Sequence, residues 1–124
     1  MIVLDASLLI GWAEPTDLHH DETLTFFEAH IDETFAASPI TLAEFYVLPA
    51  RAGKLDIARR AVFNLGVTVI ALPDDADVRL AELRANTGRK LPDCCVLLAA
   101  QQTGAAVATF DLALRTAADS LGLG

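Results

Sequence analysis

The chain opens with Met1-Ile2-Val3-Leu4-Asp5-Ala6-Ser7, and this stretch decides the fold. Its apolar run, Ile2 to Leu4, has no polar alternation, which is typical of a strand buried on both faces of a parallel sheet. The run stops at Asp5, and a second apolar run, Leu8 to Ile10, follows as the body of a predicted helix. A carboxylate therefore lies at the carboxyl end of a predicted central strand, the edge where open α/β sheets bind ligands.

Working outward, the rest of the chain alternates predicted helices with short apolar strands. Further strands are predicted at about 34–37, 67–72 and 105–109, and helices at about 7–13, 16–31, 39–50, 54–65, 74–87, 92–103 and 111–118. This alternation is the pattern of a parallel-sheet α/β domain. Because the 124 residues contain no repeat, linker or low-complexity segment, we expect one domain over residues 1–124.

Cap residues predict where several of these helices begin. Ser38-Pro39 is typical of an N-cap followed by proline at the first helical position. Thr16 or Asp17 is expected to cap the second helix, whose apolar positions Leu24, Phe27 and Ile31 predict one buried stripe.

Charge is distributed unevenly along the chain, whose net charge is −8. The first fifty residues carry nine acids and no Lys or Arg, while all nine cations lie from Arg51 onward with the other eight acids. The amino-terminal part is therefore an acidic surface suited to a basic partner. An acidic protein can still meet phosphate groups when divalent metal ions stand between the two.

The location expected from composition is the cytoplasm. No apolar run approaches the roughly 20 residues of a membrane span, and no signal peptide is evident. The two cysteines, Cys94 and Cys95, are neighbours that rarely bridge each other, so nothing indicates an oxidising compartment.

Four acids stand apart from the solvated ones. Asp5 ends the first strand, and Asp111 comes two residues after the predicted strand that ends at Thr109. Asp93 lies in the first turn of a helix that is apolar on every side and must be largely buried. Glu44 lies in mid-helix, on the same stripe as Ile40, Val47 and Leu48, where a carboxylate is costly unless something pairs with it.

Each acid also has a structural interpretation. Asp5 and Asp111 could simply cap the helices that follow their strands. Asp93 could act as a first-turn acid that interacts with the helix dipole. Glu44 has no capping role, and a salt bridge to Arg51 would join positions seven residues apart on the helix.

Considered together, the four acids suggest a metal site. Asp5 and Asp111 are expected to open into one cleft, where several carboxylates raise each other's pKa unless a cation lies between them. Mg²⁺ or Mn²⁺ suits carboxylates and water, and it can activate water and neutralise a phosphoryl group under attack. Hydroxyls close by in the sequence could orient these acids from a second layer: Ser7, Thr41 and Thr109.

With these residues in view, the chain resembles PIN-domain ribonucleases, in particular the VapC toxins of type II toxin–antitoxin pairs. The resemblance covers essentially the whole chain. It is carried by four segments, in this order and at these separations: Ile2-Val-Leu-Asp5-Ala-Ser7, Thr41-Leu-Ala-Glu44, Lys90-Leu-Pro-Asp93 and Ala108-Thr109-Phe-Asp111.

The resemblance implies a three-layer α/β/α sandwich with a central parallel sheet, and a metal-dependent endoribonuclease. It implies that Asp5, Glu44, Asp93 and Asp111 surround one or two Mg²⁺ or Mn²⁺ ions. The partners it implies are an RNA substrate, a second copy of the chain in a homodimer, and a VapB-type antitoxin whose carboxyl-terminal tail runs along the active-site groove in a hetero-oligomer. Cations that could contact RNA are Arg51, Lys54, Arg59, Arg60, Arg84, Arg89 and Lys90.

Two other classes of protein share part of this pattern. A phosphoacceptor receiver domain would pair acids after its first strand and carry a lysine after a late strand, whereas Asp5 stands alone and no lysine follows Thr109. A PIN-like scaffold that has lost catalysis and only binds a protein partner stays open as the alternative to an enzyme.

Overall fold

The centre of the protein is a four-stranded parallel sheet. A computed structural model describes all residues, 1–124, and contains strands β1 (Ile2–Leu4), β2 (Phe35–Ala37), β3 (Val67–Val69) and β4 (Ala106–Ala108). Their order across the sheet is β3-β2-β1-β4, and every neighbouring pair is parallel. The opening stretch therefore forms an inner strand, as its apolar run predicts.

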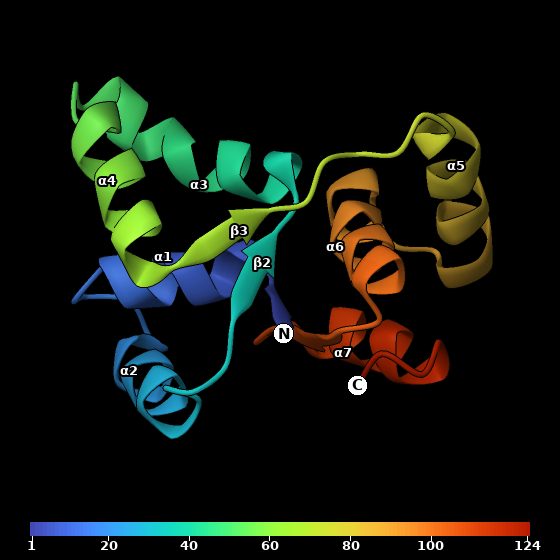
Figure 1. Cartoon of the computed structure of the whole chain (residues 1–124), viewed down its shortest axis with the longest axis horizontal. Helices are drawn as coiled ribbons and strands as arrows, with labels where there is room; N and C mark the ends of the chain where they lie inside the picture. Colours follow the sequence, from blue (N-terminus) through green and yellow to red (C-terminus); the bar gives the residue numbers. More distant parts are fainter.

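Seven helices cover the sheet in two layers, which completes a three-layer α/β/α sandwich (Figure 1). Figure 1 shows α1 to α4 on one side and α5 to α7 on the other. Their bounds are α1 (Ala6–Ala13), α2 (His20–Ala29), α3 (Pro39–Arg51), α4 (Leu55–Leu65), α5 (Ala76–Thr87), α6 (Leu91–Thr103) and α7 (Leu112–Ser120).

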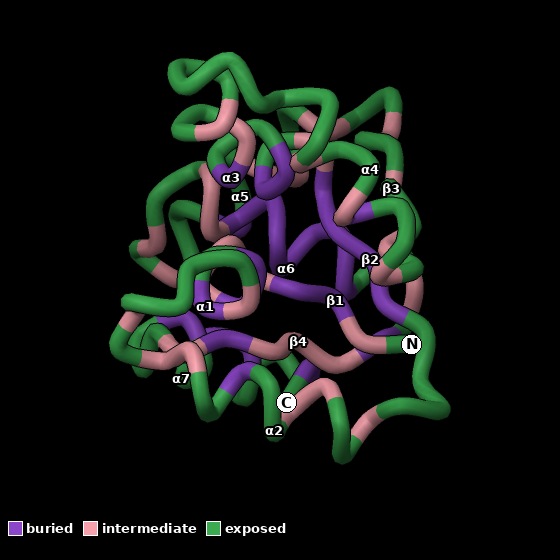
Figure 2. Tube along the Cα trace, turned by 90° about the vertical axis from the view of Figure 1, so that its left-hand side faces the viewer, coloured by how far each residue is buried: buried purple, intermediate pink, exposed green.

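Alternation along the inner strands divides the core between the two layers. Val3 and Ala36 pack with the apolar side chains of α5, α6 and α7. Leu4, Phe35 and Ala37 face the other way and pack with α1, α3 and α4. Figure 2 shows the consequence: most of β1, all of β2 and the middle of α6 are buried at the centre of the molecule. Both faces of the inner strands are therefore buried, as expected at the centre of a parallel sheet, whereas the edge strand β3 is largely exposed.

Helix ends follow the cap residues closely. The Ser38 hydroxyl accepts a hydrogen bond of 3.3 Å from the backbone N–H of Ile40, with Pro39 at the first helical position of α3. Gly66 and Gly104 end α4 and α6 with φ of 84° and 67°, a left-handed conformation that glycine adopts at little cost. These predicted boundaries are confirmed.

The second helix begins later than predicted. Its first residue is His20, and neither Thr16 nor Asp17 caps it, because Asp17 instead accepts a hydrogen bond of 2.9 Å from the backbone N–H of His19 in the preceding turn. The predicted buried stripe is also wrong at both ends, since Leu24 is 40% and Ile31 is 79% exposed, and only Phe27 is partly buried. The third predicted strand is shorter as well, since pairing with β2 stops at Val69.

None of the seven helices combines the length and the apolar character that a membrane span requires.

Candidate functional site

Asp5 accepts two hydroxyl hydrogen bonds at the end of β1. Its Oδ2 atom receives the Ser7 hydroxyl at 2.9 Å and the Thr109 hydroxyl at 2.8 Å. Asp5 occupies the N-cap position of α1, but its side chain makes no capping hydrogen bond. The capping interpretation of Asp5 is therefore wrong, and the carboxylate instead faces the end of the neighbouring strand.

The register of the sheet brings these groups together. Leu4 of β1 pairs with Ala108 of β4, and the backbone N–H of Asp5 donates to the Ala108 carbonyl at 3.0 Å. Thr109 then follows Ala108 just as Asp5 follows Leu4. Two more hydrogen bonds fix the loop: the Phe110 N–H donates to the Ser7 hydroxyl at 3.2 Å, and the Asp111 N–H donates to the Thr109 hydroxyl at 3.0 Å.

Asp111 caps α7 and still presents a second oxygen. Its Oδ1 atom accepts from the backbone N–H groups of Ala113 at 2.9 Å and Leu114 at 3.1 Å, so the capping interpretation holds for this residue. Its Oδ2 atom lies 4.0 Å from Nη2 of Arg89. Capping fixes the carboxylate by one oxygen and leaves the other directed toward the candidate site.

Asp93 is held by an arginine in the first turn of α6. Nε and Nη2 of Arg89 donate to its Oδ2 atom at 3.2 Å and 3.1 Å. The helix behind it is buried without interruption from Cys94 to Ala100, as predicted from its apolar sequence. Burial raises the pKa of the Cys94 and Cys95 thiols, which accords with both packing as small hydrophobic side chains.

Glu44 lies on the outward side of α3 together with Ile40, Val47 and Leu48, as its spacing predicts, but this side is exposed and not buried. The core-facing side of α3 carries Thr41, Leu42 and Phe45, whereas Ile40, Val47 and Leu48 are exposed with Glu44. Glu44 forms no ion pair with Arg51 or any other cation. Partial burial of its carboxylate raises its pKa, and the charges of Asp5 and Asp93 raise it further.

Thr41 lies one turn before Glu44 on α3. Its side chain is completely buried, and its Oγ1 atom has no hydrogen-bond partner. A buried hydroxyl without a partner is uncommon in proteins.

The four acids are neighbours without forming a ligand shell. Asp5 and Asp93 both act on the charge of Glu44, Thr109 links Asp5 to Asp111, and Arg89 links Asp93 to Asp111. No group of three or more acidic, His or Cys side chains is arranged to hold one metal ion. The donors nevertheless fit a hard divalent cation chemically, since they are oxygen atoms whose like charges already raise the pKa of Glu44.

Arg89 is the contact that sequence reasoning missed. The sequence places it among possible RNA contacts, whereas the structure pairs it with two of the candidate acids. The signal was available in the spacing, because an arginine four residues from an aspartate is a common ion-pair arrangement around a helical turn.

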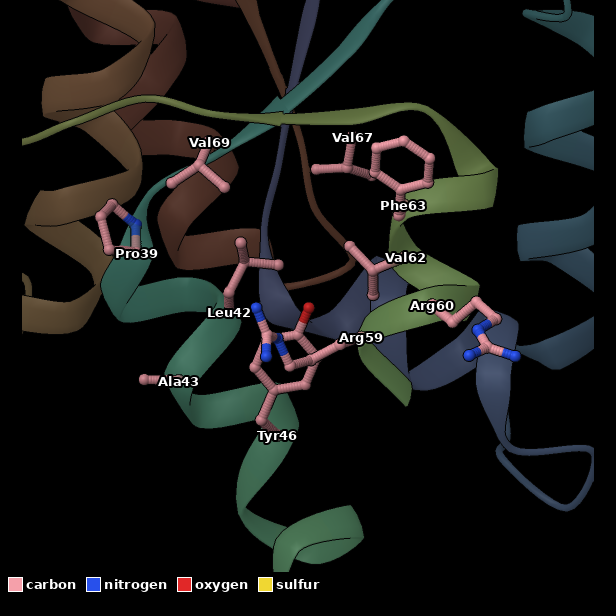
Figure 3. Close-up of a pocket in the computed structure, with 10 residues that line it drawn as sticks. All are labelled: Pro39, Leu42, Ala43, Tyr46, Arg59, Arg60, Val62, Phe63, Val67 and Val69. Carbon is pink, nitrogen blue, oxygen red and sulfur yellow. The ribbon is translucent and has the colours of Figure 1, made fainter. Parts of the chain in front are cut away.

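None of the four candidate acids lines the groove shown in Figure 3. It has a volume of about 680 Å³ and runs between α3, α4 and β3 (Figure 3). Leu42, Val62 and Val69 line it, together with Tyr46 and the cations Arg59 and Arg60. Burial raises the pKa of Tyr46, and the positive charge of Arg59 partly opposes that rise. The groove is therefore apolar with a basic margin.

Comparison with known proteins gives a family match and a set of similar folds. Residues 2–120 match the PIN domain family. No curated protein matches the sequence significantly.

Three similar solved structures span nearly the whole chain. A toxin–antitoxin complex from Klebsiella pneumoniae is 24% identical, with a TM-score of 0.76 over 90% of this chain and 87% of that one. The VapC20 toxin of Mycobacterium tuberculosis, named as cleaving the sarcin–ricin loop, is 17% identical, with a TM-score of 0.76 over 100% and 97%. VapBC2 from Rickettsia felis, bound to promoter DNA, is 18% identical, with a TM-score of 0.71 over 94% and 92%. At these identities the likeness establishes a shared fold.

Proposed function

Since this chain belongs to the PIN domain family, we propose that it is a metal-dependent endoribonuclease and the toxin of a type II toxin–antitoxin pair. The observation that carries the proposal is the position of Asp5, which two hydroxyls hold at the end of an inner strand beside three further acids. The fold is shared with a VapC toxin named as cleaving the sarcin–ricin loop and with toxin–antitoxin complexes, and this likeness favours a toxin nuclease among the activities of the family.

In the proposed site Asp5, Glu44, Asp93 and Asp111 hold Mg²⁺ or Mn²⁺. Bound metal would supply an activated water and neutralise charge on the phosphodiester under attack. The chain's own contribution is positioning. Ser7 and Thr109 fix the oxygen of Asp5 by hydrogen bonds, and the α7 cap fixes Asp111. Thr41, one helical turn before Glu44, has a buried hydroxyl without a partner and is the third supporting residue of the proposed site.

A protein partner is part of the proposal. The first fifty residues carry nine acids and no Lys or Arg, so they suit a basic antitoxin tail lying near the acids. Exposed apolar side chains on α3 and α4, among them Leu48, Ile57 and Phe63, offer area for an antitoxin or a second copy of the chain. We propose a homodimer that joins antitoxin in a hetero-oligomer and acts in the cytoplasm, where its RNA substrate is found.

The proposal is tested by titrating Mn²⁺ into the antitoxin-free protein by calorimetry. The wild type is compared with Asp5→Asn and with Asp32→Asn, a matched control in an exposed turn outside the candidate site. We expect saturable binding in the wild type and the control, and its loss in Asp5→Asn. Cleavage of total RNA that requires the same metal and the same residue would complete the support. Wild-type protein that neither binds Mn²⁺ nor cleaves RNA would refute the enzyme assignment.

The alternative is a PIN scaffold that binds protein without catalysis. The specific observation in its favour is that the acids form no ligand shell and that Arg89 already pairs with two of them. Such a scaffold would bind an antitoxin-like protein, with an affinity that does not change between EDTA and Mn²⁺.

A further inference from the structure

Arg89 differs from every other cation in the chain. Of the nine Lys and Arg residues it alone forms ion pairs, and both of its partners, Asp93 and Asp111, are candidate metal ligands. The guanidinium contacts Asp93 at 3.1 Å and approaches Asp111 to 4.0 Å. In each acid it faces the Oδ2 atom, and the Oδ1 atom of Asp111 is already used by the α7 cap. Arg89 therefore faces the oxygen of Asp111 that the α7 cap does not use.

The backbone of Arg89 is fixed on both sides. Its N–H donates to the Thr87 hydroxyl at 3.2 Å, and its carbonyl accepts from Nη1 of Arg84 at 3.1 Å and from the Cys94 thiol at 3.4 Å. The side chain is 27% exposed, so it is not enclosed. A long side chain on a fixed backbone can exchange between two positions without moving the helix behind it.

A cavity beside Arg89 offers its side chain a second position. Arg89 lines a cavity of about 360 Å³ between the end of α5 and α7. All six of the other lining residues are polar or small: Asn86, Thr87, Ala113, Thr116, Ala117 and Ser120. The guanidinium can therefore leave the two carboxylates for a polar environment rather than an apolar one.

We propose that Arg89 is a built-in counter-cation that competes with the divalent metal for Asp93 and Asp111. This inference rests on the proposed function and names a positioning residue within it. A guanidinium and a divalent ion about 4 Å apart repel each other strongly in a partly buried site, so both cannot use the same carboxylate oxygens. Metal loading therefore displaces Arg89 toward the α5–α7 cavity, and the ion pair sets the metal concentration at which the site fills.

The test compares Mn²⁺ affinity in three proteins by calorimetry: wild type, Arg89→Gln and Arg60→Gln. The control removes the same charge from the margin of the α3–α4 groove, where Arg60 forms no ion pair. We expect Arg89→Gln to bind Mn²⁺ about tenfold more tightly than wild type, which corresponds to about 1.4 kcal/mol, and Arg60→Gln to stay within about twofold. Equal or weaker binding in Arg89→Gln would overturn the inference, as would the same tightening in both variants.

Thermal unfolding separates competition from a structural role. In EDTA, Arg89→Gln is expected to have a lower Tm than wild type, because Asp93 and Asp111 lose their counter-charge. Saturating Mn²⁺ should then raise the Tm of this variant more than that of wild type. A deficit of the same size in EDTA and in Mn²⁺ would mean that Arg89 only stabilises the fold.

The two proposals fail in different ways. Wild-type binding of Mn²⁺ with unchanged affinity in Arg89→Gln would overturn only the role of Arg89. Absence of Mn²⁺ binding in all three proteins would overturn the proposed metal site, and the competition with it.

Discussion

The Thr109 hydroxyl donates a hydrogen bond of 2.8 Å to Oδ2 of Asp5, although the two residues lie 104 positions apart in the chain. The contact exists because β1 and β4 are parallel neighbours in register, so the residues after both strands meet at one edge. The same hydroxyl accepts the N–H of Asp111 at 3.0 Å. One buried side chain therefore fixes the relative positions of two candidate metal ligands.

Thr109→Val is expected to weaken both the fold and the metal site. Valine keeps the shape of the threonine side chain but removes the hydroxyl that accepts the Asp111 N–H. Thr109 is only 3% exposed, so water cannot easily replace that acceptor. The expected loss is about 1–3 kcal/mol of unfolding free energy, measured by urea denaturation. Mn²⁺ affinity should fall by about 10–100-fold, as when other supporting partners of metal ligands are removed.

Thr109→Ser is the matched control, since it retains the hydroxyl. It should keep Mn²⁺ affinity close to that of the wild type. A valine variant that binds Mn²⁺ as tightly as the serine variant would show that the hydrogen bond to Asp5 has no part in metal binding.

Asp5→Asn and Asp93→Asn are each expected to abolish metal-dependent RNA cleavage while leaving the fold intact. An amide preserves the shape of the carboxylate and can still accept the hydroxyls of Ser7 and Thr109 at position 5. Loss of the ligand charge should lower the cleavage rate at least about 100-fold, measured on total RNA with Mn²⁺. Circular dichroism checks the fold, and Asp32→Asn serves as the control. Full activity in either variant would remove that acid from the mechanism.

Local sequence signals were sufficient for most of the fold. The apolar run Ile2–Leu4 predicted the inner strand, and Ser38-Pro39 and Gly104 marked helix ends that the structure contains. The errors arose where a local signal competed with its surroundings. Asp17 was a plausible cap, but its carboxylate is used in the turn before α2. The segment after Val69 is apolar, yet its neighbouring strand β2 ends at Ala37, which pairs with Val69.

The candidate site was harder to read because it depends on contacts between distant elements. Strand-end positions predicted that Asp5 and Asp111 open at one edge, and the structure links them through Thr109. Helical spacing correctly grouped Glu44 with Ile40, Val47 and Leu48, but it could not tell that this side of α3 faces away from the core. The attachment of Arg89 to Asp93 depends on a rotamer, which no periodicity in the sequence specifies.

Glu44→Gln is expected to stabilise the protein in EDTA at neutral pH. Its pKa is raised above the ordinary value of 4.5 by partial burial and by Asp5 and Asp93, so the folded state favours the protonated carboxyl. The stability contributed by this group is present below the unfolded pKa and is lost as pH rises through the folded pKa. Glutamine cannot ionise, so it avoids that loss.

The gain at pH 7 should be less than about 1 kcal/mol, because the residue is exposed and solvent screens its charge interactions. It should disappear below about pH 4, where glutamate is protonated in both states. Urea denaturation across pH 3.5–7.5 measures the difference, with Glu28→Gln on the exposed side of α2 as the control. A variant that is less stable than wild type at pH 7 in EDTA would contradict the repulsion among these acids.

The close approach of α1 and α2 depends on Gly11. A Cβ atom at this position would collide with Oγ1 of Thr23, a completely buried hydroxyl that donates to the His19 carbonyl at 2.7 Å. That carbonyl lies 3.4 Å from the same Cβ position, so the hydroxyl has little room to move aside. Gly11→Ala is therefore expected to cost about 1–3 kcal/mol by overpacking, even though alanine is the better helix former.

A double-mutant cycle isolates this collision. Thr23→Ala alone removes the hydroxyl and its hydrogen bond, at a cost of about 1 kcal/mol. Once the hydroxyl is gone, adding Gly11→Ala should cost nothing and can recover up to about 1 kcal/mol through helix propensity. The two substitutions should therefore couple by at least about 1 kcal/mol in urea denaturation. Strictly additive effects would mean that α1 and α2 separate to admit the methyl group, and that Gly11 does not set their spacing.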